Sequence, residues 1–313
     1  MALSISVENV GRRFGQVRAL DGVTFDVPGG EVVGLLGHNG AGKTTTIRIL
    51  NGLLPPDSGT VRVLGLDPTS DGARVRARTG VLTETPSLDE RLTARENLAL
   101  FAELFAVDRA RVRGRVAELL DHFELAERAD DRVGGFSRGM KQRLALARSL
   151  LHDPELIFLD EPTAALDPVA ARGVHTLIRQ LGDDPQRTVV ISTHNLVEAQ
   201  RLCDRVLILR HGRLVAAGTP QELARSLARQ SHVELEVGPN DAQTAAAVFA
   251  DLEPGATIDI DGELVSVAGI DRERLPEVLR RLVEAGVAVY RLSPAEPTLE
   301  DAYFALHGSE GVE

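Results

Sequence analysis

Residues 37–45 read GHNGAGKTT, and they stand between the apolar run EVVGLL at 31–36 and a segment with apolar residues at helical spacing. The glycines, the lysine and the threonine fall at the positions of a P-loop, and a strand before it and a helix after it are the flanks that this motif requires. A glycine-rich turn with an incidental lysine would give similar letters. The chain contains only two lysines, Lys43 and Lys141, so a chance match is rare. The stretch predicts a phosphate-binding loop in an α/β fold.

In such a loop, glycines let backbone N–H groups turn towards phosphate oxygens, and the helix N-terminus adds a favourable dipole. Lys43 would reach the β- and γ-phosphates and support catalysis, and Thr44 would ligate Mg²⁺. The sequence therefore predicts that the chain binds ATP and Mg²⁺ here. The residues expected to hold the nucleotide are Gly37, His38, Asn39, Gly40, Ala41, Gly42, Lys43, Thr44 and Thr45.

The run LIFLDEP at 156–162 supplies a second half of the predicted site. Four apolar residues predict a buried parallel strand, and ligands of α/β folds lie at the carboxyl ends of such strands. Asp160 would then hold Mg²⁺, usually through water, and Glu161 would polarise the water that attacks the γ-phosphate. Alone, the run could be no more than a strand end, but together with the P-loop it indicates an ATPase.

The N-terminal two thirds of the chain alternate between strand and helix patterns. Residues 3–36 predict short strands, residues 44–54 a helix that ends at the breaker cluster PPDSG, and residues 93–152 a mostly helical segment. Further strands are expected at 156–160, 188–193 and 205–210, with helices at 170–181 and 196–202 between them. This rhythm is typical of an α/β domain, which we place at residues 1–218 with a helical insertion at about 86–154.

The pattern changes after Gly218. A helical linker is expected at 219–230, and residues 231–313 read as strand, helix, strand, strand, helix, strand and a closing helix. This order predicts a small ferredoxin-like α+β accessory domain. It contains no catalytic constellation, so a regulatory or dimer-supporting role is the simpler expectation.

Composition limits the classes of partner. The net charge is −11 and the pI is about 5.3, and no basic stripe interleaved with aromatics offsets this balance, so nucleic acid is not an expected partner. No stretch approaches the ~18 apolar residues of a membrane span, and Met1 to Val10 lacks a signal pattern. Cys203 is the only cysteine and excludes an internal disulfide, which fits a cytoplasmic location.

The segment FSRGMKQRLALARSLLHDP at 136–154 resembles the signature loop and helix of the ABC ATPase family. Together with the P-loop, LIFLDEPTAALD at 156–167 and ISTH at 191–194, it extends the resemblance over about residues 3–218. The family implies an integral membrane permease that handles a small-molecule substrate, a homodimer formed through the nucleotide sites, and a peripheral location on the inner face of the cell membrane. The FSRGM form, the chain length and the C-terminal extension look like the multidrug and antibiotic exporter branch.

The resemblance assigns Ser137, Gly139 and Met140 to the γ-phosphate of ATP on the opposite subunit. Arg138 replaces the usual glycine of this loop and Met140 the usual glutamine. A plain helix N-cap is the alternative role for Ser137. Asp167 matches a loop that connects the two sites of the dimer, and its alternative role is likewise an N-cap, before Pro168.

Three further positions follow from the same resemblance. His194 matches a switch histidine that contacts the γ-phosphate and orders the catalytic glutamate, although a histidine at a strand end is often structural. Phe14 stands where the family stacks an aromatic ring on adenine, and an ordinary core phenylalanine is the alternative. Glu84 stands where the family has a glutamine that touches Mg²⁺, and a carboxylate there would repel the γ-phosphate.

Two other classes of protein remain open at this stage. An ABC ATPase that acts on soluble partners without a transporter would share all these motifs, but the chain has one nucleotide domain and no long coiled-coil arm. A P-loop kinase would need an acceptor site and leaves the signature helix unexplained.

Overall fold

The computed structural model describes residues 3–164, 166–227, 232–270, 272–295 and 298–307. The chain forms two compact units, which divide between Thr219 and Pro220. The last residues of the expected linker, 228–230, lie outside the described residues, as do residue 231 and residues 308–313.

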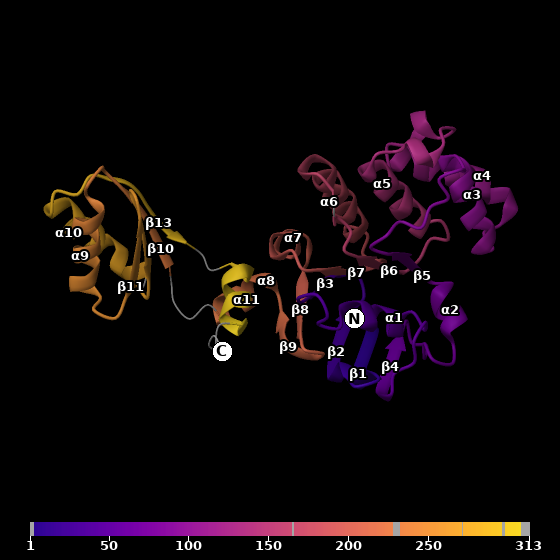
Figure 1. Cartoon of the computed structure of the whole chain (residues 1–313), viewed down its shortest axis with the longest axis horizontal. Helices are drawn as coiled ribbons and strands as arrows, with labels where there is room; N and C mark the ends of the chain where they lie inside the picture. Colours follow the sequence, from indigo (N-terminus) through magenta and orange to yellow (C-terminus); the bar gives the residue numbers. More distant parts are fainter. Residues whose placement is uncertain (1–2, 165, 228–231, 271, 296–297, 308–313) are drawn as a thin grey trace. The chain divides into compact units, whose positions relative to one another are not determined.

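A six-stranded sheet forms the centre of the first unit (Figure 1). Its strand order is β5-β6-β7-β3-β8-β9, in which neighbours are parallel except for the antiparallel edge strand β9. The bounds are β3 Val32–Leu36, β5 Thr79–Leu82, β6 Leu156–Asp160, β7 Thr188–Thr193, β8 Arg205–Arg210 and β9 Arg213–Gly218. Every residue of β3, β6 and β7 is buried, as continuous apolar runs in a parallel sheet require. The predicted strands at 156–160, 188–193 and 205–210 are confirmed.

A second, antiparallel sheet has the order β2-β1-β4, with β1 at Leu3–Phe14, β2 at Val17–Pro28 and β4 at Ser58–Val63. The prediction of short strands here was wrong in length, because β1 and β2 pair along 12 residues each and turn only at Gly15. Their inner face packs on α1 (Lys43–Leu50) in one apolar core that includes Val7, Leu35 and Ile47. The sheet therefore supports the start of the helix that follows the P-loop.

Helix α1 ends earlier than the predicted Leu54. Its last residue is Leu50, and Gly52 has a φ of +63°. A Cβ on Gly52 would lie 2.3 Å from the carbonyl oxygen of Pro68, so only glycine fits this turn. The helix therefore ends at the turn around Gly52, where the backbone passes close to Pro68, and not at the proline cluster at 55–56.

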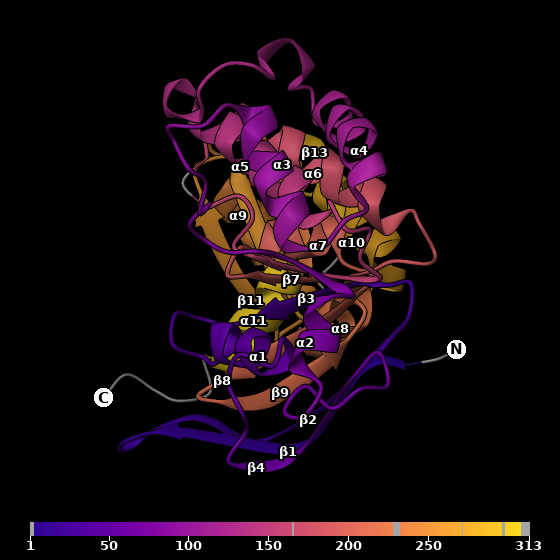
Figure 2. The same ribbon diagram turned by 90° about the vertical axis from the view of Figure 1, so that its right-hand side faces the viewer.

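Helices cover the other side of the central sheet. In Figures 1 and 2, α3 to α6 lie on one side of this sheet, and α1 and the antiparallel sheet lie on the other. A capping box begins α3: the Thr93 side chain accepts from the Glu96 N–H, and the Glu96 carboxylate accepts from the Thr93 N–H. Besides α1, the helices of the first unit are α2 Gly72–Arg76, α3 Ala94–Leu104, α4 Arg109–His122, α5 Arg138–Ser149, α6 Pro168–Gly182 and α7 Leu196–Leu202, with 3₁₀ turns at Ala126–Arg128 and Val133–Gly135. The mostly helical segment predicted from Thr93 is confirmed.

The second unit contains an antiparallel sheet of order β11-β12-β10-β13. Its elements are β10 His232–Val237, α9 Ala242–Leu252, β11 Thr257–Asp261, β12 Leu264–Ala268, a 3₁₀ turn at Arg272–Arg274, α10 Leu275–Glu284 and β13 Val289–Ala295. Buried residues of α9 and α10, such as Phe249 and Leu282, form one core with Leu235 and Val265 of the sheet. The predicted ferredoxin-like α+β fold is confirmed.

Two helices complete the second unit. Helix α8 (Pro220–Leu227) lies where the linker was expected, and it packs against the closing helix α11 (Leu299–His307). Among the described residues of both units, no helix combines the length and the apolar character needed to cross a bilayer.

Candidate active site: a nucleotide cleft at the carboxyl ends of the central strands

The P-loop connects the buried strand β3 to α1. Gly42 immediately precedes this helix with a φ of +111°, and a Cβ there would lie 2.8 Å from the carbonyl oxygen of Ala19. A side chain would therefore clash with the backbone of β2, and only glycine allows the loop to close onto that strand. The helix begins at Lys43, so its free N–H groups face the loop.

Lys43 is only 6% exposed and points back over the loop. Its Nζ donates to the carbonyl oxygen of Gly37 at 2.6 Å and to that of His38 at 3.3 Å, and it lies 3.8 Å from a carboxylate oxygen of Glu161. Burial lowers the pKa of Lys43, and the negative charges of Glu161 and Asp160 oppose that shift. The loop thus holds a cation beside the carboxylates at the end of β6.

Asp160 and Thr44 face each other across the cleft. The Thr44 Oγ1 donates to the Asp160 Oδ2 at 3.2 Å, and Glu84 lines the same cleft. Oxygen donors of this kind suit Mg²⁺, which takes one or two protein ligands and completes its shell with water and phosphate. In the described part of the chain, no three His, Cys, Asp or Glu side chains are grouped closely enough to hold a metal. Thr44, Asp160 and Glu84 could therefore supply part of a Mg²⁺ shell.

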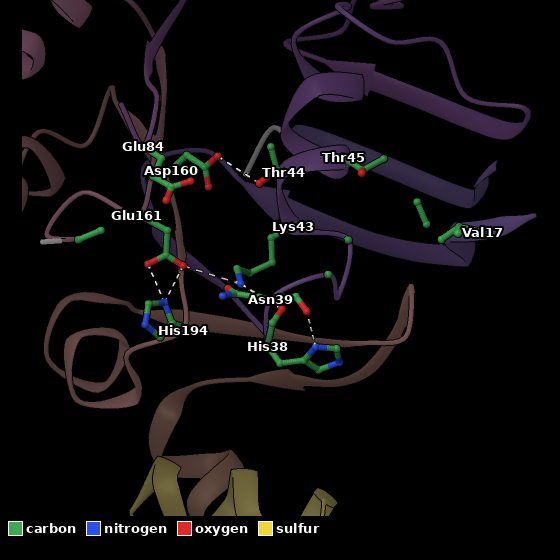
Figure 3. A pocket seen from close by; sticks show the side chains of 14 residues that line it. Val17, His38, Asn39, Lys43, Thr44, Thr45, Glu84, Asp160, Glu161 and His194 are labelled. Atoms are coloured by element: carbon green, nitrogen blue, oxygen red, sulfur yellow. Dashed lines mark hydrogen bonds and ion pairs between the residues drawn. The ribbon is translucent and has the colours of Figure 1, made fainter. Parts of the chain in front are cut away.

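Glu161 and His194 stand on neighbouring strand ends, because β6 and β7 are adjacent and parallel. The His194 Nδ1 lies 2.9 Å from both carboxylate oxygens of Glu161, as Figure 3 shows. A carboxylate only accepts, so Nδ1 carries the proton in this contact. Glu161 has a φ of +51°, which non-glycine residues rarely adopt, and its N–H donates to the Ser192 carbonyl oxygen at 2.8 Å. This hydrogen bond to β7 helps to hold the Glu161 backbone in that conformation.

A cleft of about 430 Å³ brings most of the predicted site residues together. Those that line it are His38, Asn39, Gly40, Gly42, Lys43, Thr44, Thr45, Glu84, Asp160, Glu161 and His194. Ala41 is fully buried, and its N–H donates to the His38 carbonyl oxygen within the loop. Three lining residues were missed by the sequence reasoning: Val17, Ala19 and Ala164. The first two belong to β2, and their only signal was their place in a hairpin whose length the sequence did not reveal.

Phe14 is not a core residue, because its side chain is 46% exposed. It pairs across the hairpin with Val17, which lines the cleft, and the Arg12 guanidinium lies 5.1 Å from its ring centroid. The alternative of an ordinary core phenylalanine is therefore wrong. An exposed aromatic ring at the end of the β1–β2 hairpin is free to stack on a planar ligand.

The signature loop stands apart from this cleft. Ser137 is the N-cap of α5 and its Oγ accepts the Met140 N–H at 3.2 Å, while Asp167 is the N-cap of α6. Ser137, Gly139 and Met140 are absent from the described residues that line the cleft. Within one chain, Ser137 and Asp167 thus have the capping roles that were their alternatives.

Comparison with known proteins adds to this geometry. A profile of the ABC transporter family matches residues 20–164, which include the P-loop and the β6 strand end. The chain is 40% identical to the daunorubicin resistance ATP-binding protein DrrA3 of Streptomyces coeruleorubidus, over 98% of this chain and 96% of that protein. It is 38% identical to the Nod factor export ATP-binding protein I of Burkholderia orbicola, over 98% and 97% of the two chains.

Solved structures agree with these relatives. The structure of cbiO1 from Clostridium perfringens, part of an ABC transporter complex, superposes with a TM-score of 0.67 at 26% identity and covers 73% of this chain and 94% of its own. A structure described as the ATP binding subunit of an ABC transporter gives a TM-score of 0.63 at 34% identity, over 72% and 93%. Since a relative is 40% identical across nearly the whole sequence, the family is established: this chain belongs to the ATP-binding subunits of ABC transporters, and it is an ATPase.

Proposed function

We propose that this chain is the ATPase subunit of an exporter of drugs or other small molecules. It would work as a homodimer on the inner face of the cell membrane, against an integral membrane permease that handles the substrate. Relatives named for daunorubicin resistance and for Nod factor export align over 98% of the chain, including the second unit. The net charge of −11 argues against nucleic acid as a partner.

The chemistry that we propose is in-line attack of water on the γ-phosphate of ATP. Glu161 would polarise the water, and His194, hydrogen-bonded to both carboxylate oxygens, would fix its orientation. Lys43 would neutralise charge on the β- and γ-phosphates. Mg²⁺, held by Thr44, Asp160 and Glu84 when bound, would neutralise further phosphate charge. Phe14 would stack on the adenine.

The proposal of a homodimer rests on the separation, within one chain, of two elements that we expect to bind phosphate. Ser137 is exposed at the N-terminus of the 12-residue helix α5, yet it does not line the cleft around Lys43. A helix N-terminus favours an anion. Ser137, Gly139 and Met140 would therefore meet the γ-phosphate held by a second copy of the chain.

Disulfide cross-linking tests this arrangement. Asn39 and Arg138 are both exposed, and the only native cysteine is buried, so a chain carrying Asn39→Cys and Arg138→Cys has two reactive thiols. We expect a covalent dimer that forms with ATP and not with ADP. The control pairs Asn39→Cys with Val215→Cys on the edge strand β9, and should not respond to ATP. ATP-independent cross-linking, or none, would contradict the composite site.

Two further observations separate the other classes. Copurification of an integral membrane protein from detergent-solubilised membranes is expected for a transporter subunit, and a soluble partner in its place would favour a transporter-independent ATPase. Phosphate release from ATP without any added acceptor distinguishes hydrolysis from kinase activity.

A further inference from the structure

A buried glutamate outside the proposed reaction joins the two strand ends that carry Glu161 and His194. Glu198 lies on α7 and is 1% exposed. Its Oε1 accepts from the Thr163 Oγ1 at 2.8 Å and from the His175 Nε2 at 3.0 Å, and its Oε2 accepts from the Thr193 Oγ1 at 2.6 Å. Three side chains from three different segments therefore converge on one carboxylate.

These contacts keep Glu198 ionised in spite of its burial. Burial by itself raises the pKa of a carboxyl group, but the hydrogen bonds from His175, Thr193 and Thr163 outweigh it and lower the pKa of Glu198. A buried charge is tolerated only where it is paired and hydrogen-bonded, so removing any one donor leaves the carboxylate less well satisfied.

The donors are neighbours of the proposed catalytic residues. Thr193 directly precedes His194, and Thr163 is two residues beyond Glu161. Thr193 also accepts the Asn195 N–H at 3.0 Å, so its hydroxyl hydrogen is directed to Glu198 and its lone pair to the backbone beyond His194. Glu198 thus connects the loop that follows β6 to the last residue of β7.

Helix α5 also contacts the loop that follows β6. The Gln142 Nε2 donates to the Pro162 carbonyl oxygen at 2.6 Å, and Gln142 is only 4% exposed. Pro162 lies between Glu161 and Thr163, so the loop is fixed between α5 and the Glu198 carboxylate.

We propose that Glu198 is a positioning residue for ATP hydrolysis: through Thr163 and Thr193 it sets the placement of Glu161 relative to His194. This inference rests on the proposed roles of Glu161 and His194. A general base must lie within hydrogen-bond reach of the attacking water, and an error of about 1 Å can reduce a rate by about 10²-fold. Among the described residues, the printed hydrogen bonds of Glu198 run to Thr163, His175 and Thr193 and none to the P-loop, so we expect ATP binding to change less than turnover.

The first test separates turnover from ATP affinity. Glu198→Gln keeps the shape but removes the charge, and it should lower kcat by about 10-fold or more while the ATP dissociation constant changes less than about 3-fold. The matched pair Thr193→Val and Thr193→Ser tests whether one hydrogen-bond donor to Glu198 is needed for turnover. Valine removes the hydroxyl and should lower kcat, whereas serine retains it and should restore most of the activity. This pair remains informative if Glu198→Gln does not fold.

A double-mutant cycle then distinguishes positioning from general destabilisation. The rate of single-turnover hydrolysis is measured with and without Glu198→Gln, in the native chain and in a His194→Ala chain. If Glu198 acts through His194, the ratio of the two rates should approach one in the His194→Ala chain. The control is Leu120→Ala in the buried face of α4, a helix that carries none of the hydrogen-bond partners of Glu198; it should lower thermal stability and cause the same fold change in both backgrounds.

The outcomes separate the two proposals. Wild-type kcat in Glu198→Gln, or equal losses for Thr193→Val and Thr193→Ser, would overturn the positioning role, and so would full additivity with His194→Ala. Normal turnover in Glu161→Gln would instead contradict the proposed mechanism itself, independently of the result for Glu198.

Discussion

The substitution Glu161→Gln tests the proposed chemistry most directly. It keeps the size of the side chain and replaces one carboxylate oxygen by an amide group, which can no longer take a proton from water. Both residues are unbranched at Cβ, so the strained φ of +51° is equally tolerable in the variant. The change therefore removes the charge and leaves the backbone of the site in place.

The expected loss follows from the role of a general base. Such a group contributes about 10²- to 10⁴-fold to a rate, or about 3 to 5 kcal/mol of activation free energy. ATP binding should survive or become tighter. In the native cleft Glu161 lies 3.8 Å from Lys43, and Glu84 and Asp160 are also present, so removing one carboxylate lessens repulsion of the phosphates and frees Lys43 to pair with them.

The assay measures phosphate release at saturating ATP with Mg²⁺, ATP affinity by calorimetry, and self-association by sedimentation in ATP and in ADP. Unhydrolysed ATP between Lys43 of one chain and Ser137 of another should stabilise a dimer that ADP does not.

The matched control is Glu155→Gln, at the opposite end of β6, where the carboxylate pairs with Arg78 at 2.7 and 2.8 Å. It is the same chemical change at the residue that immediately precedes β6, and it should leave turnover unaltered. Turnover within about threefold of wild type in Glu161→Gln would refute Glu161 as the base.

Three other outcomes are expected. Lys43→Ala should weaken ATP binding about 10- to 100-fold, because a charge-assisted contact to buried phosphate oxygens is lost; unchanged affinity in calorimetry would remove Lys43 from the site. A chain of residues 1–219 should fold and bind ATP with unaltered affinity, since the cleft-lining residues in the described part of the chain all lie before Asn195; a folded fragment without ATP binding would show that the second unit contributes to the site. Cys203 should react with thiol reagents at pH 8 only after unfolding, because burial raises the pKa of its thiol and the thiolate is the reactive form; rapid labelling of the native chain would contradict this.

Local sequence signals predicted much of the fold. The strands β6, β7 and β8 and the helix α7 begin and end at the predicted residues, because each is a short apolar or amphipathic run between clear breakers. Most cleft residues between His38 and Thr45, with Asp160 and Glu161, were also identified, since phosphate chemistry restricts both residue type and spacing. His194 was assigned only from the family resemblance, and it lines the same cleft. Strands that depend on pairing were harder to predict. The hairpin of β1 and β2 is longer than the sequence suggested, and β4 and β9 were missed because their exposed polar faces interrupt the apolar pattern. Strand β5 was missed because it has only four residues, one of them a glycine.

The Glu198 contacts show why part of the site could not be predicted from the sequence. In LVEAQRL, a glutamate on a seven-residue helix has no feature that indicates burial, and its partners His175 and Thr163 are 23 and 35 residues away. They meet only because β6 and β7 pair in parallel and α6 packs against α7. Motifs identify residues whose type is dictated by the phosphates. The type of a residue that holds those groups in place depends instead on the side chains packed around it. We therefore expect that a substitution of His175 in α6 or Glu198 in α7 can alter hydrolysis without any contact to ATP.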